Sequence, residues 1–215
     1  MDNPGERTFT SKEELREAVW EYMEIRDLVD NPRPCHGIVP NFCGAQTAAH
    51  LLTTLPEWKK ARVIFTGPDI SLHQVHCEAL LEGKKLLVAA PCLTGFCLLN
   101  GVPADEVLAA TSVEEFALYG RSVNIDPFLP RIDLYITGAV AVDKRGNRIG
   151  KGKGGIGDRE DDLLVRAGLI KHDTPRITLV HDVQLFDDFS HLMRKNDRRV
   201  SIIVTPHEVW RVAVD

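Results

Sequence analysis

The 215-residue sequence lacks several features that would place it outside the cytoplasm or in a membrane. Its five cysteines are odd in number and form no CxxC pair, which argues against a disulfide framework and favours reduced thiols. No apolar run approaches the roughly 18 residues needed to span a bilayer. The N-terminus has no apolar core of the kind found in signal peptides. We therefore expect a soluble, cytoplasmic protein with no membrane partner.

An excess of positive charge is also lacking, because the formal net charge is −5. This balance argues against a general nucleic-acid binder, which normally presents a basic face. The sequence has no GxSxG nucleophile elbow, no Cys-His signature of a thiol hydrolase and no GxxxxGK[ST] phosphate loop. The corresponding hydrolases and P-loop enzymes are therefore not indicated.

Short apolar segments alternate with helix-like segments along the chain. Strands are predicted at 62–66, 84–90, 132–142, 176–180 and 200–204, and helices at 11–28, 45–55, 72–82, 112–119 and 158–169. Residues 91–103 and 123–130 are expected to be irregular. Strands that are apolar on both faces and alternate with helices predict a mainly parallel sheet covered on two sides. We expect one α/β domain spanning residues 1–215.

The most distinctive stretch is 144–158, KRGNRIGKGKGGIGD, which holds six of the sixteen glycines and five lysines or arginines. A strand followed by a glycine-rich basic loop and a helix presents backbone N–H groups and cations to a phosphate. The spacing Gly150-x-Gly152-x-x-Gly155 matches a dinucleotide fingerprint only weakly, because Lys151 and Lys153 crowd cations into the turn. A β-hairpin with solvated lysines is the alternative. Five neighbouring cations repel one another, which favours a polyanionic ligand.

Two further features lie near predicted helix starts. Lys12 and Arg16 are four residues apart, so both side chains leave the same side of the first helix, either as a solvated charged face or as part of a site. Asp158 falls in the first turn of the helix after the basic loop. It can be a simple N-cap, or it can hold Mg²⁺ beside a phosphate.

The histidines give two weaker patterns. His73, His76 and Cys77 could contribute to a metal site, but no second pair completes tetrahedral coordination at a recognisable spacing. His181-Asp182 follows a predicted strand, where the carboxylate could orient the imidazole at the ligand crevice of an α/β sheet. A buried, hydrogen-bonded pair explains the same dipeptide.

Several separated pieces together resemble one family. They are the helix with Lys12 and Arg16, the stretch DLYITGAVAVDKRGNRIGKGKGG, the motif His181-Asp182-x-Gln184, and Asp197 before VSIIVTPHEV. In this order they resemble 5-formyltetrahydrofolate cyclo-ligase, also called methenyltetrahydrofolate synthetase. PRPCHGIVPNFCGAQTAA and KEELREAVWEYME look most similar to the divergent branch of methenyltetrahydrofolate synthetase domain-containing proteins.

The resemblance implies a three-layer αβα fold like that of the ribose-isomerase and CoA-transferase group. It also implies a ligase of one-carbon metabolism that uses ATP and Mg²⁺ to convert 5-formyltetrahydrofolate to 5,10-methenyltetrahydrofolate. Lys153 and Arg148 would be catalytic, and Asp158 and Asp197 match the magnesium-binding acids of the family. The residues implied to bind the nucleotide are Lys12, Arg16, Arg148, Gly150, Lys151, Gly152, Lys153, Gly154 and Gly155.

The sequence departs from the family pattern in two places. Gly155-Ile156-Gly157 precede Asp158 where the family has two aromatics, so a stacking surface for a pterin ring is missing. Asp69 is only a rough counterpart of the substrate-side glutamate of the family. We therefore expect either the cyclo-ligase or a close paralogue with another substrate, as a monomer or small homo-oligomer that binds a small molecule such as a reduced folate. The alternatives are a non-catalytic nucleotide- or metabolite-binding protein and, less favoured, a CoA-transferase-like or sugar-phosphate enzyme.

Overall fold

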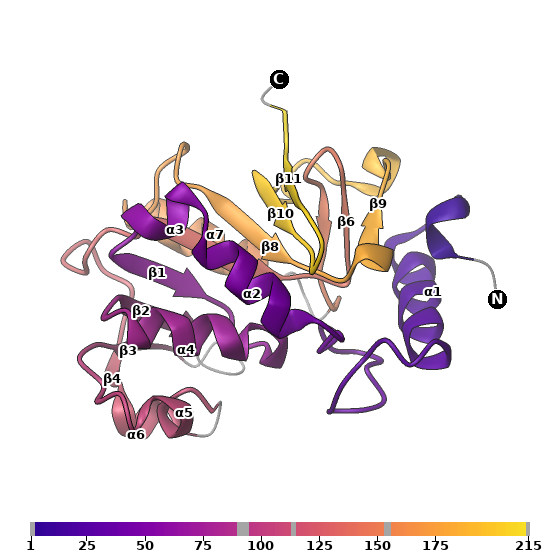
Figure 1. The fold of residues 1–215 in the computed structure, drawn as a ribbon. Coiled ribbons are helices and arrows are strands. Elements are labelled where there is room, and N and C mark those ends of the chain that lie inside the picture. Colours follow the sequence, from indigo (N-terminus) through magenta and orange to yellow (C-terminus); the bar gives the residue numbers. More distant parts are fainter. Residues whose placement is uncertain (1–2, 90–94, 113–114, 153–155, 214–215) are drawn as a thin grey trace.

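The computed structural model of the protein describes residues 3–89, 95–112, 115–152 and 156–213, with the side chains at 6, 117 and 156–158 left aside (Figure 1). Four of the five cysteines fall in these ranges, and all four are free thiols: Cys35, Cys43, Cys77 and Cys97. No helix in these ranges is both long enough and apolar enough to cross a bilayer.

The fold is built on a mixed sheet of eight strands in the order β11-β10-β8-β5-β1-β2-β3-β4. The five central strands run parallel, and the edge strands β11, β3 and β4 pair antiparallel. The strands are β1 (Val63–Thr66), β2 (Lys85–Ala89), β3 (Phe96–Leu99), β4 (Arg121–Val123), β5 (Leu134–Gly138), β8 (Arg176–Leu179), β10 (Ile202–Val204) and β11 (Val209–Arg211).

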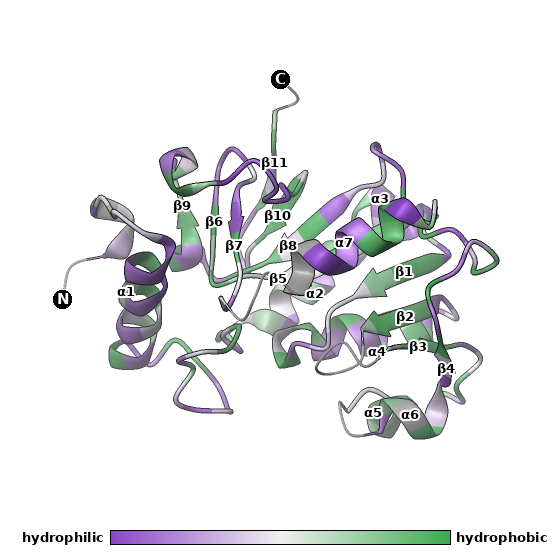
Figure 2. Ribbon diagram, turned by 180° about the vertical axis from the view of Figure 1, so that it is seen from behind, coloured by the Kyte–Doolittle hydropathy of each residue, from purple (hydrophilic) through white to green (hydrophobic). Residues whose placement is uncertain are grey.

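Helices cover both faces of this sheet, with α2 and α4 on one face and α7 on the other (Figures 1 and 2). The helices are α1 (Lys12–Ile25), α2 (Ala45–Thr53), α3 (Pro56–Lys60), α4 (His73–Leu81), α5 (Val107–Ala110), α6 (Phe116–Tyr119) and α7 (Ile156–Arg166). The predicted α/β architecture with a mainly parallel sheet in three layers is therefore confirmed.

Successive side chains of each strand point to opposite faces of the sheet, so the hydrophobic core is divided into one cluster on each face. Ile64 and Leu86 pack in one buried cluster with residues of α2 and α4. The next residues along, Phe65 and Leu87, pack in a second cluster with Leu164 of α7. Alternate side chains of a strand point to opposite faces, so a strand buried on both faces must be apolar throughout. Figure 2 shows β1 and β2 in green, as hydrophobic strands, between α7 and α4.

The predicted strand at 132–142 is divided in the structure. β5 ends at Gly138, and the chain then joins a second sheet of order β7-β6-β9. The strands of this small sheet are β6 (Ala141–Asp143), β7 (Arg148–Ile149) and β9 (Leu185–Phe186). Gln184 is fully buried at the junction, where its Nε2 donates to the carbonyls of Ala139 and Val140, each at 3.0 Å. This side chain stabilises the bend between the sheets.

The segments predicted to be irregular are partly extended. Phe96–Leu99 forms β3 within 91–103, and Val123 ends β4 at the start of 123–130. Both strands are short and antiparallel, and Pro and Gly beside them hide the strand pattern in the sequence.

Candidate functional site

A cleft of about 800 Å³ opens where strands β1 and β5 of the main sheet end at their carboxyl termini. In open α/β sheets this edge is the usual place for ligands. The walls come from the start of α1, the loop after β1, the end of β5, the stretch after β6 and the loop before β10. The lining includes five residues with cationic side chains, and we call it the basic cleft: Lys12, Arg16, Arg148, Lys151 and Arg194.

Helix α1 presents the first two of these cations from one side, as the spacing predicted. The hydroxyl of Ser11 caps the helix by accepting from the Glu14 N–H at 3.1 Å, which fixes where its first turn begins. Lys12 forms an ion pair with Asp197, whereas the Nε of Arg16 donates to the carbonyl of Gly150 at 2.7 Å. Leu15 and Val19 follow Lys12 by three and seven residues, so they lie on the same side of the helix, and both are fully buried. Their packing therefore holds the two neighbouring cations on the cleft wall.

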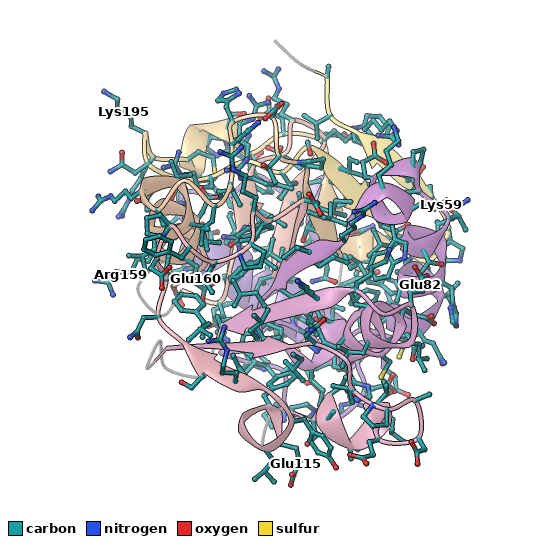
Figure 3. All side chains as sticks on the ribbon, turned by 90° about the vertical axis from the view of Figure 1, so that its left-hand side faces the viewer. Lys59, Glu82, Glu115, Arg159, Glu160 and Lys195 are labelled. Atoms are coloured by element: carbon teal, nitrogen blue, oxygen red, sulfur yellow. The ribbon has the colours of Figure 1, made fainter. Side chains whose placement is uncertain are left out.

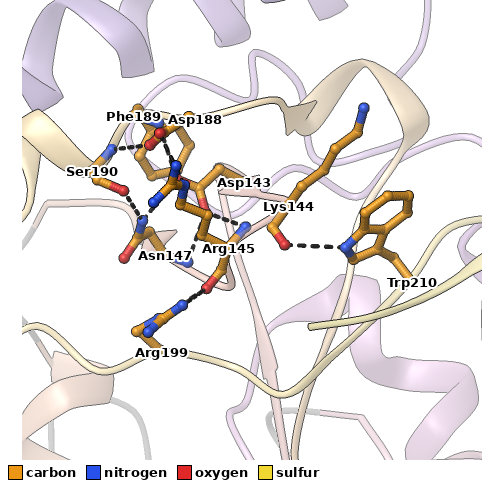
Figure 4. Close-up of polar contacts among 9 residues, drawn as sticks. All are labelled: Asp143, Lys144, Arg145, Asn147, Asp188, Phe189, Ser190, Arg199 and Trp210. Atoms are coloured by element: carbon orange, nitrogen blue, oxygen red, sulfur yellow. Dashed lines mark hydrogen bonds and ion pairs between the residues drawn. The ribbon is translucent and has the colours of Figure 1, made fainter. Parts of the chain in front are cut away.

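The β6–β7 hairpin carries the basic loop and is anchored by one buried carboxylate (Figure 4). Asp143 is fully buried and accepts from the N–H groups of Arg145, Asn147 and Phe189 and from Asn147 Nδ2, at 2.8–3.0 Å. The Asn147 Nδ2 also donates to Ser190 Oγ at 2.8 Å. A carboxylate with this many donors is fully satisfied, so the hairpin has one defined conformation.

After β7 the backbone turns back toward α1 at Gly150 and Gly152. Gly152 has φ +86°, and a Cβ built on it would lie 3.0 Å from Cζ of Arg16. Only glycine combines this backbone conformation with so close an approach. The Nζ of Lys151 pairs with Asp69 Oδ1 at 3.1 Å across the cleft, and Arg148 donates to the carbonyl of Gly138 at 3.3 Å. Lys153, Gly154 and Gly155 lie outside the described residues.

The two predicted magnesium acids lie in different settings. Asp197 lies on the cleft wall, where burial alone would raise its pKa, but the Lys12 ammonium and the Arg194 N–H lower it overall. Its carboxylate is therefore ionised at neutral pH and already paired. Asp158 belongs to the first turn of α7, and its side chain is not described.

Other lining residues carry no motif that would have identified them from the sequence. Glu160 of α7 is only 4% exposed although it is acidic, and it lines the cleft. Figure 3 shows it against the body of the molecule, whereas its neighbour Arg159 projects outward. Arg194 and His191 also line the cleft, from the segment between β9 and β10. A glutamate at the fifth position of a helix after a basic loop gives only a weak sequence signal.

The histidine patterns form neither a metal site nor a catalytic pair in the described part of the chain. His76 Nε2 contacts Thr66 Oγ1 at 2.8 Å, whereas His73 Nε2 contacts Thr111 Oγ1 at 3.1 Å, so the two rings have different partners. Asp182 Oδ2 contacts His207 Nδ1 at 2.6 Å, and His181 Nδ1 instead accepts from the Val183 N–H at 3.2 Å. The dipeptide at 181–182 therefore begins a short 3₁₀ turn.

Among the described residues, three potential metal ligands come close together at Glu24, Cys35 and His36. Burial raises the pKa of the Cys35 thiol to about 12, with a further contribution from Glu24. Since thiolate is the form that binds metals, this pKa disfavours a metal there. Glu24 is also engaged by Arg33 at 2.9 Å.

The fold and the basic cleft define an α/β protein with a cation-lined cleft at the carboxyl edge of its parallel strands. The model of the 5-formyltetrahydrofolate cyclo-ligase family matches residues 8–206. The chain belongs to this family. It is 37% identical over 210 residues to a methenyltetrahydrofolate synthase domain-containing protein of Bos taurus, and 34% identical over 206 residues to that of Homo sapiens. These alignments cover 94% and 93% of this chain but 54% and 53% of the relatives, so the chain spans about half their length.

Two solved structures have the same fold. A 5,10-methenyltetrahydrofolate synthetase of Aquifex aeolicus, solved by NMR, matches with a TM-score of 0.59 at 23% identity, over 95% of this chain and 94% of that one. The 5,10-methenyltetrahydrofolate synthetase of Mycoplasma pneumoniae matches with a TM-score of 0.51 at 13% identity, over 88% and 97% of the two chains. The predicted family, including its synthetase domain-containing branch, is confirmed.

Proposed function

We propose that the chain is an ATP- and Mg²⁺-dependent cyclo-ligase that converts 5-formyltetrahydrofolate to 5,10-methenyltetrahydrofolate, or a close paralogue with a different substrate. Family membership supports the folate cyclo-ligase class. The observation that carries the nucleotide part is the basic cleft, which gathers cations from segments far apart in a chain of net charge −5. The five cations outnumber the four carboxylates of the same described lining, Glu13, Asp69, Glu160 and Asp197, so the cleft keeps a positive excess inside an acidic protein, which favours a polyanion.

The residues of the cleft fit a triphosphate. Lys12, Arg16 and Lys151 each pair with a carboxylate of the same cleft, respectively Asp197, Glu13 and Asp69. These cations are thus held in position before any ligand binds. ATP would supply the phosphoryl group that activates the formyl oxygen for ring closure, and this chain would supply charge and positioning.

The acids suit a hard cation beside the phosphates. Mg²⁺ takes carboxylate and phosphate oxygens together, and Asp197 has an ionised carboxylate on the cleft wall. Mg²⁺ at Asp197 would release the Lys12 ammonium to a phosphate. Asp158 is the second proposed ligand, and Lys153 with Arg148 the proposed catalytic cations.

Turnover is tested directly by incubating the purified protein with MgATP and 5-formyltetrahydrofolate while methenyl absorbance is followed. Turnover supports the cyclo-ligase. ATP binding without turnover leaves the paralogue or the non-catalytic nucleotide-binding protein, which remains the second candidate because no aromatic pair follows the glycine loop.

The loop assignment is tested by ATP titration of two matched lysine variants. Lys153→Ala should weaken ATP binding by about 10- to 100-fold, since one charge-assisted hydrogen bond contributes about 1.5–3 kcal/mol. The control is Lys144→Ala, because Lys144 lies at the start of the same basic stretch but pairs with the exposed Asp187 at 2.6 Å. Equal affinities of both variants and wild type would refute the nucleotide assignment.

A further inference from the structure

A second cleft of about 730 Å³ adjoins the basic cleft and differs from it in composition. Pro68 and Asp69, in the loop after β1, line both. The rest of the second cleft comes from Asp30 and Asn41 between α1 and α2, the start of α2, the short turn at Ile70–Leu72, the first turn of α4 and the end of α5. No lysine, arginine, phenylalanine, tyrosine or tryptophan occurs among its described lining residues.

Two buried polar groups on the wall of this cleft have no hydrogen-bond partner in the described part of the chain. They are the hydroxyl of Ser71 and the Nδ1 of His76, and each side chain is only 1% exposed. A buried polar group left unpaired costs about 1–3 kcal/mol. Two such groups on the wall of one cleft therefore indicate a ligand that supplies the missing hydrogen bonds.

The start of α2 adds further hydrogen-bonding groups to the same wall. Gly44 is the N-cap and has no side chain with which to cap this nine-residue helix. The first N–H groups of a helix lack intrahelical partners and carry a partial positive charge. Gln46 and Thr47 of this turn line the cleft, and so does Ser112. The wall thus offers hydroxyl and carboxamide groups beside the two unpaired ones.

Electrostatics exclude most charged ligands from this cleft. Asp30 repels an anion, the carboxylate of Asp69 is already paired with Lys151, and the described lining offers an anion no lysine or arginine of its own. Burial lowers the pKa of His76 to about 3, with a smaller contribution from His73, so neither imidazole supplies positive charge at neutral pH. A cation would face the positive end of α2 and the Lys151 ammonium on Asp69. An uncharged ligand meets neither obstacle.

We propose that the second cleft is a binding site for an uncharged, polyhydroxylated compound of the sugar or polyol class. A hydroxyl both donates and accepts, so one ligand can satisfy Ser71, the His76 ring and the N–H groups of the first turn of α2 that have no intrahelical partner. Carboxylates such as Asp69 accept readily from neighbouring hydroxyls. The absence of aromatic side chains from the described lining removes the stacking surface that a planar heterocycle needs. This inference does not rest on the nucleotide proposal.

The test is a titration of protein labelled with ¹⁵N-histidine by D-ribose, D-glucose and myo-inositol, followed by NMR of the imidazole nitrogens. At least one compound should shift the Nδ1 resonance of His76 saturably, with Kd in the millimolar range or tighter. Ser71→Ala should weaken that binding about three- to tenfold, as expected for one hydrogen bond. Without ligand its thermal unfolding temperature should be no lower than that of wild type, because the substitution removes a buried hydroxyl that has no partner in the described structure.

Lys12→Met is the matched control, because Lys12 lines only the basic cleft. It should weaken ATP binding and leave the polyol titration unchanged, whereas Ser71→Ala should do the reverse. The proposal is overturned if none of the three compounds shifts the His76 resonance saturably, or if Ser71→Ala binds them as tightly as wild type. Neither result bears on the cyclo-ligase assay, so the two proposals can fail separately.

Discussion

At the scale of single residues, the burial of His76 should make the stability of the fold depend on pH. Its Nε2 contacts Thr66 Oγ1 at 2.8 Å and the Gly67 carbonyl at 3.2 Å, and its ring packs edge-on to Phe116. Burial holds its pKa near 3, below the ordinary value of 6.5. Between these two pH values the unfolded chain binds a proton that the folded chain does not. The free energy of unfolding must therefore fall as pH is lowered through this window.

Replacing His76 by glutamine should remove that part of the pH dependence. At pH 5 the wild type should have lost about 2 kcal/mol through this group relative to pH 7, at about 1.4 kcal/mol per pH unit below 6.5. Urea unfolding at pH 7, 6 and 5 measures the difference. His73 and His181 also have lowered pKa values and remain in both proteins, so only the difference in slope counts. Identical slopes would contradict the prediction.

Gly152 gives a second residue-scale prediction, concerning the position of Arg16. In Gly152→Ala the new Cβ would lie 3.0 Å from Cζ of Arg16, at a φ of +86° that alanine rarely adopts. The guanidinium should be displaced from the Gly150 carbonyl, and ATP should bind about tenfold more weakly. Isothermal titration measures this affinity.

Gly83→Ala is the control for backbone strain alone. Gly83 has φ +69°, and a Cβ there meets nothing within 4 Å. This variant should lose some stability, about 1 kcal/mol, and keep the ATP affinity of wild type. If the two alanine variants bind ATP equally, the contact with Arg16 has no role in binding.

At the scale of elements, the β6–β7 hairpin depends on Asp143. Asp143→Ala should lower the free energy of unfolding by at least about 3 kcal/mol, because several buried N–H donors lose their acceptor at about 1–3 kcal/mol each. Denaturant unfolding gives the change in stability, and hydrogen exchange of amides 145–149 should accelerate. Asp187→Ala removes an exposed partner of Lys144 nearby and should cost less than about 1 kcal/mol. A comparable loss in both variants would show that Asp143 is not the anchor.

The same elements show which parts of the site the sequence could predict. Lys12 and Arg16 were placed on one side of a helix because their spacing depends only on the helical period. The bend at Ala139–Val140 was not predicted, since it is stabilised by Gln184, more than forty residues later in the chain. The pairing of Asp182 with His207 was missed for the same reason, as the two are 25 residues apart. Local periodicity predicts elements, and contacts between distant segments decide where they bend.

At the scale of the whole molecule, the two clefts should respond differently to salt. ATP affinity should fall as ionic strength rises, because salt screens the attraction between the cations of the basic cleft and the phosphates. The affinity for the polyol should not change with ionic strength, since this proposed ligand is uncharged. Titrations with ATP and with the polyol at low and high sodium chloride concentration measure the two affinities. A salt-dependent polyol affinity would contradict the prediction.

The ion pair between Lys12 and Asp197 also has a consequence for synthesis of the chain. Its partners are 185 residues apart in sequence, so α1 leaves the ribosome long before Asp197 is translated. At about 5–20 residues per second, that interval lasts about 10–40 s. Throughout it Leu15, Val19 and Met23, buried in the finished fold, lack much of their core. The nascent chain must therefore keep the apolar side of this amphipathic helix from aggregating until the segment that contains Asp197 has been synthesised.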